Sequence, residues 1–285
     1  MNHRIIARLD IKGPNLVKGI HLEGLRVLGK PEHFAKYYYE AGADELMFTD
    51  VVASLYERNS LEEIITKVAK EVFIPLTVGG GIRTIDDIKK AFRAGADKVS
   101  INTAAIKNPF FIREATKKFG SSNIVITIEA IKHPDGKYYA YTDNGREETG
   151  VEVIEWAKKA EELGAGELII TSVDLEGTGQ GFDLELTKSV SDAVSIPVVA
   201  HGGAGNAEDI KNVINEGKAD AVAIASILHY SYAEKYLTEH TVDFKAEGNT
   251  SFLNSGKNYS KIVKTRIEDI KDYLKNNNVD CRVTL

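Results

Sequence analysis

The amino-acid sequence predicts an α/β fold, a closed (β/α)₈ TIM barrel built from two similar half-barrels. Short apolar segments alternate along the chain with longer amphipathic ones, a pattern typical of βαβ units and a parallel sheet. Three motifs of the first half also recur in the second half in the same order. The chain has 285 residues, and a TIM barrel takes about 250 residues, so one such barrel fits the length.

Eight segments are predicted to be strands, because each is short, apolar and bounded by polar or turn-forming residues. In chain order they are 5–9, 45–50, 74–78, 98–102, 124–129, 167–172, 197–200 and 221–225. Helices are predicted where apolar residues recur with helical spacing. They include 32–40, 61–71, 85–94, 151–163, 207–216 and a last helix near 261–275. Eight βα units suit a closed barrel better than an open sheet.

The internal repeat supports this closure. Segment 41–46 resembles 163–168, segment 78–81 resembles 200–203, and segment 96–99 resembles 219–222, so the offsets are 122, 122 and 123 positions. Three chance matches in one order at nearly one offset are improbable. We therefore predict a single domain, 1–285, with half-barrels at about residues 1–120 and 121–285.

One segment, about 239–259, interrupts the regular pattern and is rich in Asn, Ser, Gly and Lys. Loops longer than about 12–15 residues are usually functional or disordered. This segment follows the eighth strand, so we expect it over the catalytic face of the barrel. It is interpreted either as a lid or partner contact, or as a disordered insertion.

Composition excludes several classes of protein. The net charge of −6 argues against nucleic-acid binding, which normally requires a basic face. The single cysteine, Cys281, rules out an intramolecular disulfide and a cysteine-based zinc site. No histidine spacing suggests a metal, and we expect neither metal nor cofactor. The N-terminal residues lack the apolar stretch of a signal peptide, and no apolar segment is long enough to span a membrane. A cytoplasmic protein without a membrane partner is therefore expected.

The ends of the predicted strands carry carboxylates, and TIM barrels place their reacting groups there. Asp10 ends the first strand and Glu129 the fifth, so they should face each other across the opening. Such a pair can act as general base and general acid if its surroundings push the two pKa values apart. Asp50 ends the second strand. For all three residues the alternative is that they only cap the following helix.

Two glycine-rich turns follow the third and seventh strands, and they are related by the repeat. Glycine lets backbone amides approach an anion closely. Polar groups after the fourth and eighth strands can add donors beside each turn. Two symmetric sites predict a ligand with a phosphate at each end. The residues are Gly80, Gly81, Asn102 and Thr103 on one side, and Gly202, Gly203, Ala225 and Ser226 on the other, with His201 as a further candidate for a phosphate or a carbonyl.

Charges also stand at the beginnings of strands. Glu45, Lys98 and Glu167 begin the even-numbered strands, which share layers inside a barrel. With Arg4 they could form a charged ring across the bottom of the barrel. Buried charges are costly unless paired, so the alternative is that they point outward into solvent.

Several of these motifs resemble the cyclase subunit of imidazole glycerol phosphate synthase. The resemblance lies in segments 4–10, 78–82, 95–104 and 164–178 and runs over about residues 3–230 and the last helix. The sister isomerase of histidine biosynthesis shares the fold and the phosphate turns. Segment 97–104, with the sequence Asp-Lys-Val-Ser-Ile-Asn-Thr-Ala, points to the cyclase.

The resemblance implies a mechanism and a partner. A glutaminase docks at the N-terminal face and releases ammonia, which passes a charged gate and travels along the barrel axis. At the top, ammonia reacts with a bis-phosphorylated ribulosyl formimino carboxamide ribotide to give imidazole glycerol phosphate and an aminoimidazole carboxamide ribotide. The catalytic residues are Asp10 and Glu129, and the gate is Arg4, Glu45, Lys98 and Glu167. Substrate and phosphate contacts are expected from Lys18, Asp50, Gly80, Gly81, Asn102, Thr103, Thr171, Glu176, Gly177, His201, Gly202, Gly203, Ala225 and Ser226.

The sequence also departs from the family. The family has aspartate where this chain has Glu129 and Glu176, and usually serine where it has His201. Segments 13–15 and 21–26 and the insertion differ as well. These changes cluster at the catalytic end, a pattern that resembles paralogues that deliver ammonia to a sugar nucleotide for amidine formation in surface glycan biosynthesis. The cyclase and this paralogue are both retained as hypotheses. A third, a non-catalytic activator of a glutaminase, is disfavoured because Asp10 and both glycine turns are present.

Overall fold

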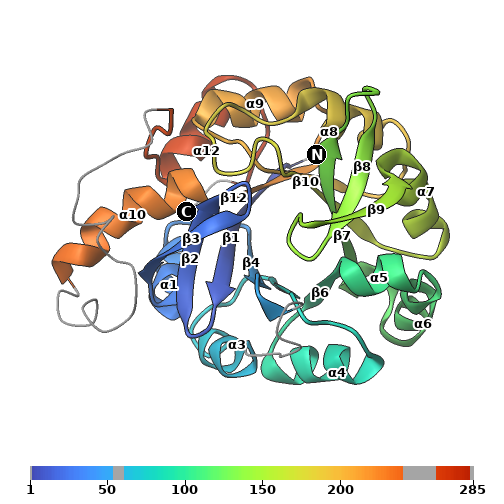
Figure 1. Cartoon of the computed structure of the whole chain (residues 1–285). Coiled ribbons are helices and arrows are strands. Elements are labelled where there is room, and N and C mark those ends of the chain that lie inside the picture. Colours follow the sequence, from blue (N-terminus) through green and yellow to red (C-terminus); the bar gives the residue numbers. More distant parts are fainter. Residues whose placement is uncertain (1, 54–60, 240–260, 283–285) are drawn as a thin grey trace.

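Eight parallel strands form a closed barrel with helices around its outside (Figure 1). The computed structural model describes residues 2–53, 61–239 and 261–282. Strand β7 pairs with β10 and so closes the ring, which confirms the predicted TIM barrel. The barrel strands are β1 (Arg4–Lys12), β4 (Glu45–Asp50), β5 (Leu76–Gly79), β6 (Lys98–Ile101), β7 (Ile124–Lys132), β10 (Glu167–Ser172), β11 (Val198–His201) and β12 (Ala221–Ile224).

Helices follow the barrel strands and cover the outside of the ring. They are α1 (Pro31–Glu40), α3 (Glu62–Val68), α4 (Ile85–Ala94), α5 (Thr103–Lys107), α6 (Phe110–Phe119), α7 (Val153–Glu162), α8 (Leu184–Ser191), α9 (Ala207–Asn215), α10 (Ser226–Glu239) and α12 (Ile267–Asn276), with a 3₁₀ turn, η1, at Ser121–Asn123. Within the described ranges, no helix has the length and apolar character needed to cross a membrane. The insertion predicted at 239–259 lies outside the described residues, except for Glu239, which ends α10.

Two equivalent helices, one in each half of the barrel, begin with the same capping arrangement. Helix α4 begins with a capping box in which the side chains of Thr84 and Asp87 each accept the other's backbone N–H. Helix α9 begins with the same arrangement between Asn206 and Asp209, 122 positions later. Such a box satisfies N–H groups that a helix start otherwise leaves without partners. The equivalence of the caps follows from the internal repeat.

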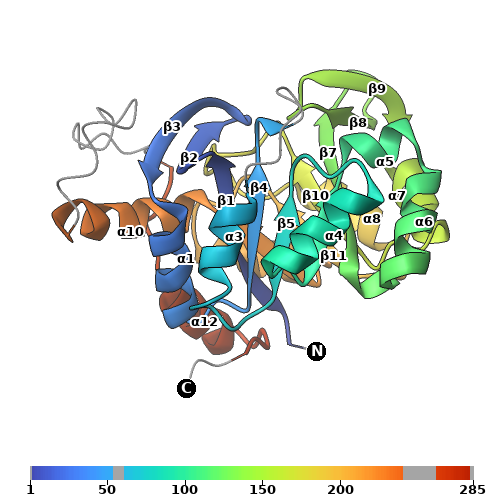
Figure 2. The same ribbon diagram turned by 90° about the horizontal axis from the view of Figure 1, so that it is seen from below.

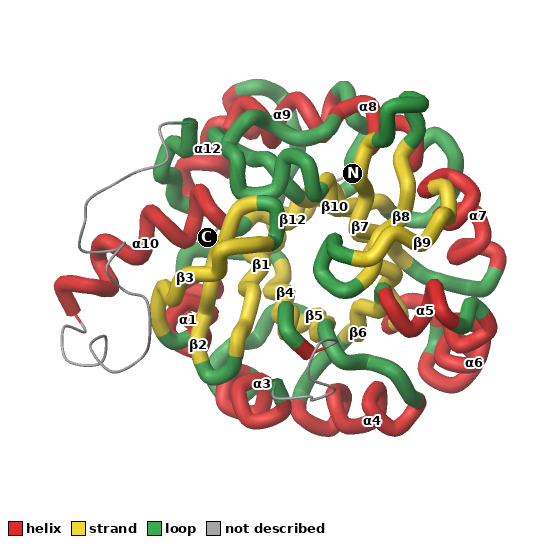
Figure 3. The backbone as a smooth tube through the Cα atoms, viewed as in Figure 1, coloured by secondary structure: helices red, strands yellow, loops and turns green. Residues whose placement is uncertain are grey.

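Two hairpins extend one end of the barrel. Strand β1 continues into the antiparallel pair β2 (Asn15–Ile20) and β3 (Glu23–Gly29). Strand β7 continues into β8 (Tyr138–Thr142) and β9 (Glu147–Glu152). Figure 2 shows both hairpins at the same end, with α12 at the opposite end, and Figure 3 shows their strands, in yellow, at the rim of the ring. The helix predicted from residue 151 therefore begins later, at Val153.

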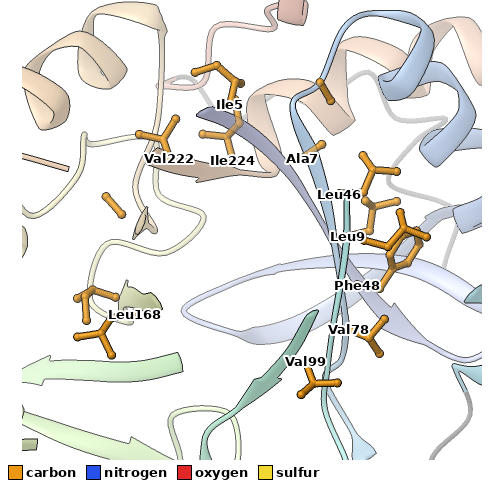
Figure 4. Packing of buried hydrophobic residues seen from close by; sticks show 14 of the residues in the cluster. Ile5, Ala7, Leu9, Leu46, Phe48, Val78, Val99, Leu168, Val222 and Ile224 are labelled. Carbon is orange, nitrogen blue, oxygen red and sulfur yellow. The ribbon is translucent and has the colours of Figure 1, made fainter. Parts of the chain in front are cut away.

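Apolar residues fill both sides of the barrel wall. In β1 the alternating residues Ile5, Ala7 and Leu9 belong to the large core between strands and helices, part of which Figure 4 shows. The intervening residue Ile6 belongs to a separate cluster inside the barrel, because side chains alternate across a strand. That inner layer consists of Ile6, Met47, Val125, Ile169, Val199, Ala221 and Ala223. Full burial of such a side chain contributes about 1.5–3 kcal/mol.

Candidate active site

A cavity of about 410 Å³ opens at the C-terminal ends of β4, β5, β6 and β7, which we call the open half of the mouth. It brings together predicted residues from four strand ends with several residues that were not predicted, Arg8 among them. Its lining includes Arg8, Thr49, Asp50, Gly80, Gly81, Asn102, Thr103, Thr127, Glu129, Asp143 and Asn144.

The glycine turn of the open half requires glycine. Gly80 and Gly81 have φ values of 84° and 75°, in a region that other residues seldom adopt. A Cβ atom on Gly80 would lie 2.3 Å from the backbone oxygen of Asp50. The side chain of Asp50 accepts the N–H of Val52 at 3.0 Å, so Asp50 both orders its own turn and lines the cavity. This packing leaves the turn's backbone at the cavity surface, where its amides can meet an anion.

The two predicted catalytic carboxylates have opposite environments. Burial opposes the ionisation of Asp10, but the positive charges of Arg8 and Lys18 outweigh it and lower the pKa of Asp10. The Nε of Arg8 donates to Oδ1 of Asp10 at 3.0 Å, and Lys18 Nζ lies 3.9 Å from Oδ2. For Glu129, burial raises the pKa to about 7, although the N–H of Gly145 donates to its Oε2 at 2.8 Å. Near neutral pH, Asp10 is therefore ionised while Glu129 is protonated in part of the molecules.

The other half of the mouth, which we call the closed half, is filled by its own side chains. The space among the residues predicted for the second phosphate is about 10 Å³, much less than a phosphate needs. Lys18 Nζ forms an ion pair with Oε1 of Glu176, and both residues are buried. The second oxygen of Glu176 accepts the N–H of Leu22 at 2.9 Å. The residues predicted for the second phosphate therefore lie together, and the cation among them, Lys18, is paired with a carboxylate of the chain itself.

His201 also belongs to the closed half. Its Nδ1 lies 2.9 Å from the carbonyl oxygen of Ala223, which requires a proton on Nδ1. Burial and the charge of Arg8 lower the pKa of His201, so the ring is neutral. Its Nε2 has no hydrogen-bond partner within the described ranges. His201 therefore packs as a neutral side chain whose free nitrogen is an acceptor.

The β2–β3 hairpin covers the closed half. His21 donates its N–H to the carbonyl oxygen of Glu176 at 2.9 Å, and Asn144 Nδ2 donates to the carbonyl oxygen of Leu22 at 2.8 Å. A Cβ atom on Gly177, whose φ is 74°, would lie 2.6 Å from the oxygen of Gly19. Hydrogen bonds and close backbone contact therefore hold the hairpin against the second site.

A charged ring closes the opposite end of the barrel. Arg4 pairs with Glu45 at 2.9 Å and also with Glu167. Lys98 Nζ bridges the same two carboxylates at 2.9 and 3.0 Å. Thr77 donates its hydroxyl to Glu45 at 2.5 Å. Of the two interpretations, inward ring or outward charges, the structure has the ring, in which every charge is paired.

Arg8 is a site residue that was not predicted, as are Thr127, Asp143 and Asn144. It stands two positions before Asp10 in β1 and therefore points to the same side of the strand, the inside of the barrel. It is 2% exposed. Its Nη1 lies 3.4 Å from the hydroxyl oxygen of Thr171, one of the predicted substrate contacts. A charged residue at an inward position of an otherwise apolar strand was the signal that could have identified it.

Comparisons with known proteins agree with the fold. Residues 4–234 match the family model described as histidine biosynthesis protein. The imidazole glycerol phosphate synthase subunit HisF of Legionella pneumophila is 58% identical over 208 residues, which cover 73% of this chain and 98% of that protein. The protein of the same name from Alkaliphilus metalliredigens (strain QYMF) is 46% identical over 228 residues, covering 80% of this chain and 90% of that protein.

Proposed function

Because the chain belongs to the histidine biosynthesis family and within it to the HisF type, we propose that it catalyses the cyclase reaction of imidazole glycerol phosphate synthase. In that reaction, ammonia and the bis-phosphorylated ribulosyl formimino carboxamide ribotide give imidazole glycerol phosphate and an aminoimidazole carboxamide ribotide. The observation that carries the proposal is the pair Asp10 and Glu129, whose pKa values are shifted in opposite directions. Such a pair supplies an ionised base and a protonated acid at one pH.

The open half is proposed to bind one phosphate end of the substrate. The turn at Gly80 and Gly81 borders the same cavity as Asn102 and Thr103. Backbone amides at such a turn can donate to phosphate oxygens at close range. The Nδ2 of Asn102 donates to the carbonyl oxygen of Tyr141 at 3.1 Å. Its side-chain oxygen lacks a hydrogen-bond partner within the described residues, so it can accept a hydrogen bond from a hydroxyl or N–H group of the ligand. Glu129 lines this cavity and can transfer protons to a substrate held there.

The charged ring is proposed as a gate for ammonia. Above the ring lies the apolar inner layer, through which neutral ammonia can pass more readily than ammonium, since an unpaired charge is costly in apolar surroundings. The relatives are named as subunits of a synthase. We therefore propose a glutaminase partner that docks at the N-terminal end of the barrel, next to Arg4, Glu45, Lys98 and Glu167.

Complementation tests this function in a cell. A bacterial strain without its own cyclase subunit is supplied with this protein and grown without histidine on ammonium-rich medium, which removes the need for a matched glutaminase. Growth is expected, and Asp10→Asn is expected to abolish it. Absence of growth with the intact protein present in folded form would count against the proposal.

One observation favours a second candidate function. The closed half has no room for a second phosphate while Lys18 pairs with Glu176. A sugar nucleotide, whose phosphates are adjacent, could place its charge in the open half alone. The second candidate is therefore ammonia transfer to a sugar nucleotide for amidine formation. Binding of a uridine diphosphate sugar to the purified protein, with the ribulosyl precursor failing to compete, would favour it over the cyclase.

A further inference from the structure

Arg8 borders the open cavity and is paired with Asp10. Arg8 lines the cavity, whereas Asp10 is not among the lining residues. Both side chains are buried, with 2% of each residue exposed. In the described conformation the barrel therefore presents a guanidinium, rather than the carboxylate paired with it, to a ligand in the open half.

The guanidinium is fixed in place and still has donors to offer. Its Nε donates to Asp10 at 3.0 Å, and one Nη1 hydrogen points to Thr171 at 3.4 Å. A guanidinium has five N–H donors in a rigid plane. The hydrogen bonds found among the described residues use two of them, so three remain on a group that borders the cavity. Asp10 and Thr171 come from β1 and β10, so the barrel wall itself holds the plane.

Glu129 lines the same cavity as Arg8, and the charge of Arg8 acts on it as well. A substrate atom in this space can therefore meet a fixed cation and a proton donor together. Fixed donors aimed at developing negative charge usually give the largest single contribution to catalysis.

We propose that Arg8 is a catalytic residue that binds the oxygen of the ketone attacked by ammonia and stabilises the negative charge that forms on it. This role rests on the proposed function, because that function supplies both the ammonia and the ketose carbonyl. Asp10 is then a positioning residue in this step, because it holds the guanidinium in the required plane.

The step balances without any further reactant. The lone pair of ammonia forms a bond to the carbonyl carbon, and the π electron pair of the C=O bond moves to the oxygen beside Arg8. Protonated Glu129 gives its proton to that oxygen. The resulting carboxylate takes a proton from the cationic nitrogen, so Glu129 returns to its starting state. The product of the step is a neutral carbinolamine.

The test compares Arg8→Ala and Arg8→Lys with the wild-type chain in ammonium-driven turnover of the ribulosyl precursor. Arg8→Ala is expected to lower kcat at least about 100-fold, the effect of removing an oxyanion donor, with KM changed much less. Guanidinium ion, added far below denaturing concentration, should restore part of kcat because it can occupy the vacated space. Arg8→Lys keeps the charge opposite Asp10 and therefore preserves folding. It should still lose about 10-fold or more, since one ammonium cannot replace the planar donors.

Matched controls separate catalysis from folding. Arg113 is exposed, so Arg113→Ala should keep wild-type kcat and show no response to guanidinium. Wild-type kcat in Arg8→Lys, or an Arg8→Ala defect that guanidinium leaves unchanged in folded protein, would overturn the proposal. Absence of turnover by the wild-type chain would instead refute the proposed function, and this role with it.

Discussion

Replacing Glu129 with glutamine is expected to stabilise the protein at alkaline pH and to remove its proposed acid at the same time. Glutamine has the shape of the protonated side chain and can still accept the N–H of Gly145, which Glu129 Oε2 accepts at 2.8 Å. It carries no charge at any pH. The substitution therefore removes the cost of burying a carboxylate and leaves the local packing unchanged.

The magnitude follows from the pKa. Burial raises the pKa of Glu129 from 4.5 to about 7, and each unit corresponds to about 1.4 kcal/mol. The folded protein holds this proton more tightly than the unfolded chain, so stability falls as pH rises from 4.5 to about 7 and then stays level. Glu129→Gln lacks this loss. Its gain in free energy of unfolding should be about 3 kcal/mol at pH 8 and below about 1 kcal/mol at pH 5.

Urea denaturation at the two pH values measures this difference. Glu63→Gln, at an exposed position, is the matched control and should change little at either pH. In the ammonium-driven assay, with free ammonia held constant, the kcat of the wild-type protein should fall about tenfold per pH unit above pH 7, because the protonated acid is lost. At pH 6 the kcat of Glu129→Gln should be at least about 100-fold lower than that of the wild-type protein. Equal stability of Glu129→Gln and wild type at pH 8 would contradict a raised pKa of Glu129 in the folded protein.

Three further results are expected. Lys18→Met should lower the free energy of unfolding, measured in urea, by about 3–5 kcal/mol, because it leaves the carboxylate of Glu176 buried without its partner. The double variant Lys18→Met/Glu176→Leu should recover most of this free energy. No recovery would argue against a buried ion pair between the two residues. Gly80→Ala should lower the stability by more than about 2 kcal/mol, because its Cβ would contact a backbone oxygen. Gly136→Ala is the control, since Gly136 has the same φ of 84° but nothing within 4 Å of the added Cβ, and it should cost about 1 kcal/mol. Equal shifts of Tm in the two variants would contradict the close contact at Gly80. Lys98→Met should raise the glutamine hydrolysed per product several-fold with a glutaminase present, and unchanged coupling would count against the gate.

The barrel could be predicted because each strand is short and apolar, and because the internal repeat indicated that the second half of the chain has the same strands and helices as the first. The bounds of β4, β10 and α4 agree with the prediction. The β2–β3 hairpin was missed. Its turn residues His21 and Leu22 adopt φ values of 53° and 61°, and a leucine there gives none of the Asn-Gly signal that marks such turns. The β8–β9 hairpin was not predicted either, although its turn, at Asp143, Asn144 and Gly145, contains that signal.

The site was predictable where strand position alone determines it. Glu45 and Glu167 lie at strand beginnings, so the barrel topology brings them together around Arg4 and Lys98. Asp10 and Glu129 lie near the carboxyl ends of β1 and β7. The closed half was not predictable, because Lys18 and Glu176 are 158 positions apart and pair only through the fold of the hairpin. Arg8 was passed over because charged residues inside a strand usually face solvent, and only the closed ring makes its inward position certain.

The proposed cyclase function is tested by turnover of the histidine-pathway ribulosyl precursor by the purified protein, with an ammonium salt and no partner. Imidazole glycerol phosphate and aminoimidazole carboxamide ribotide are expected in equal amounts, with kcat declining above pH 7 as Glu129 ionises. Folded protein that yields neither product would contradict the cyclase function and direct attention to sugar nucleotides as acceptors of the ammonia.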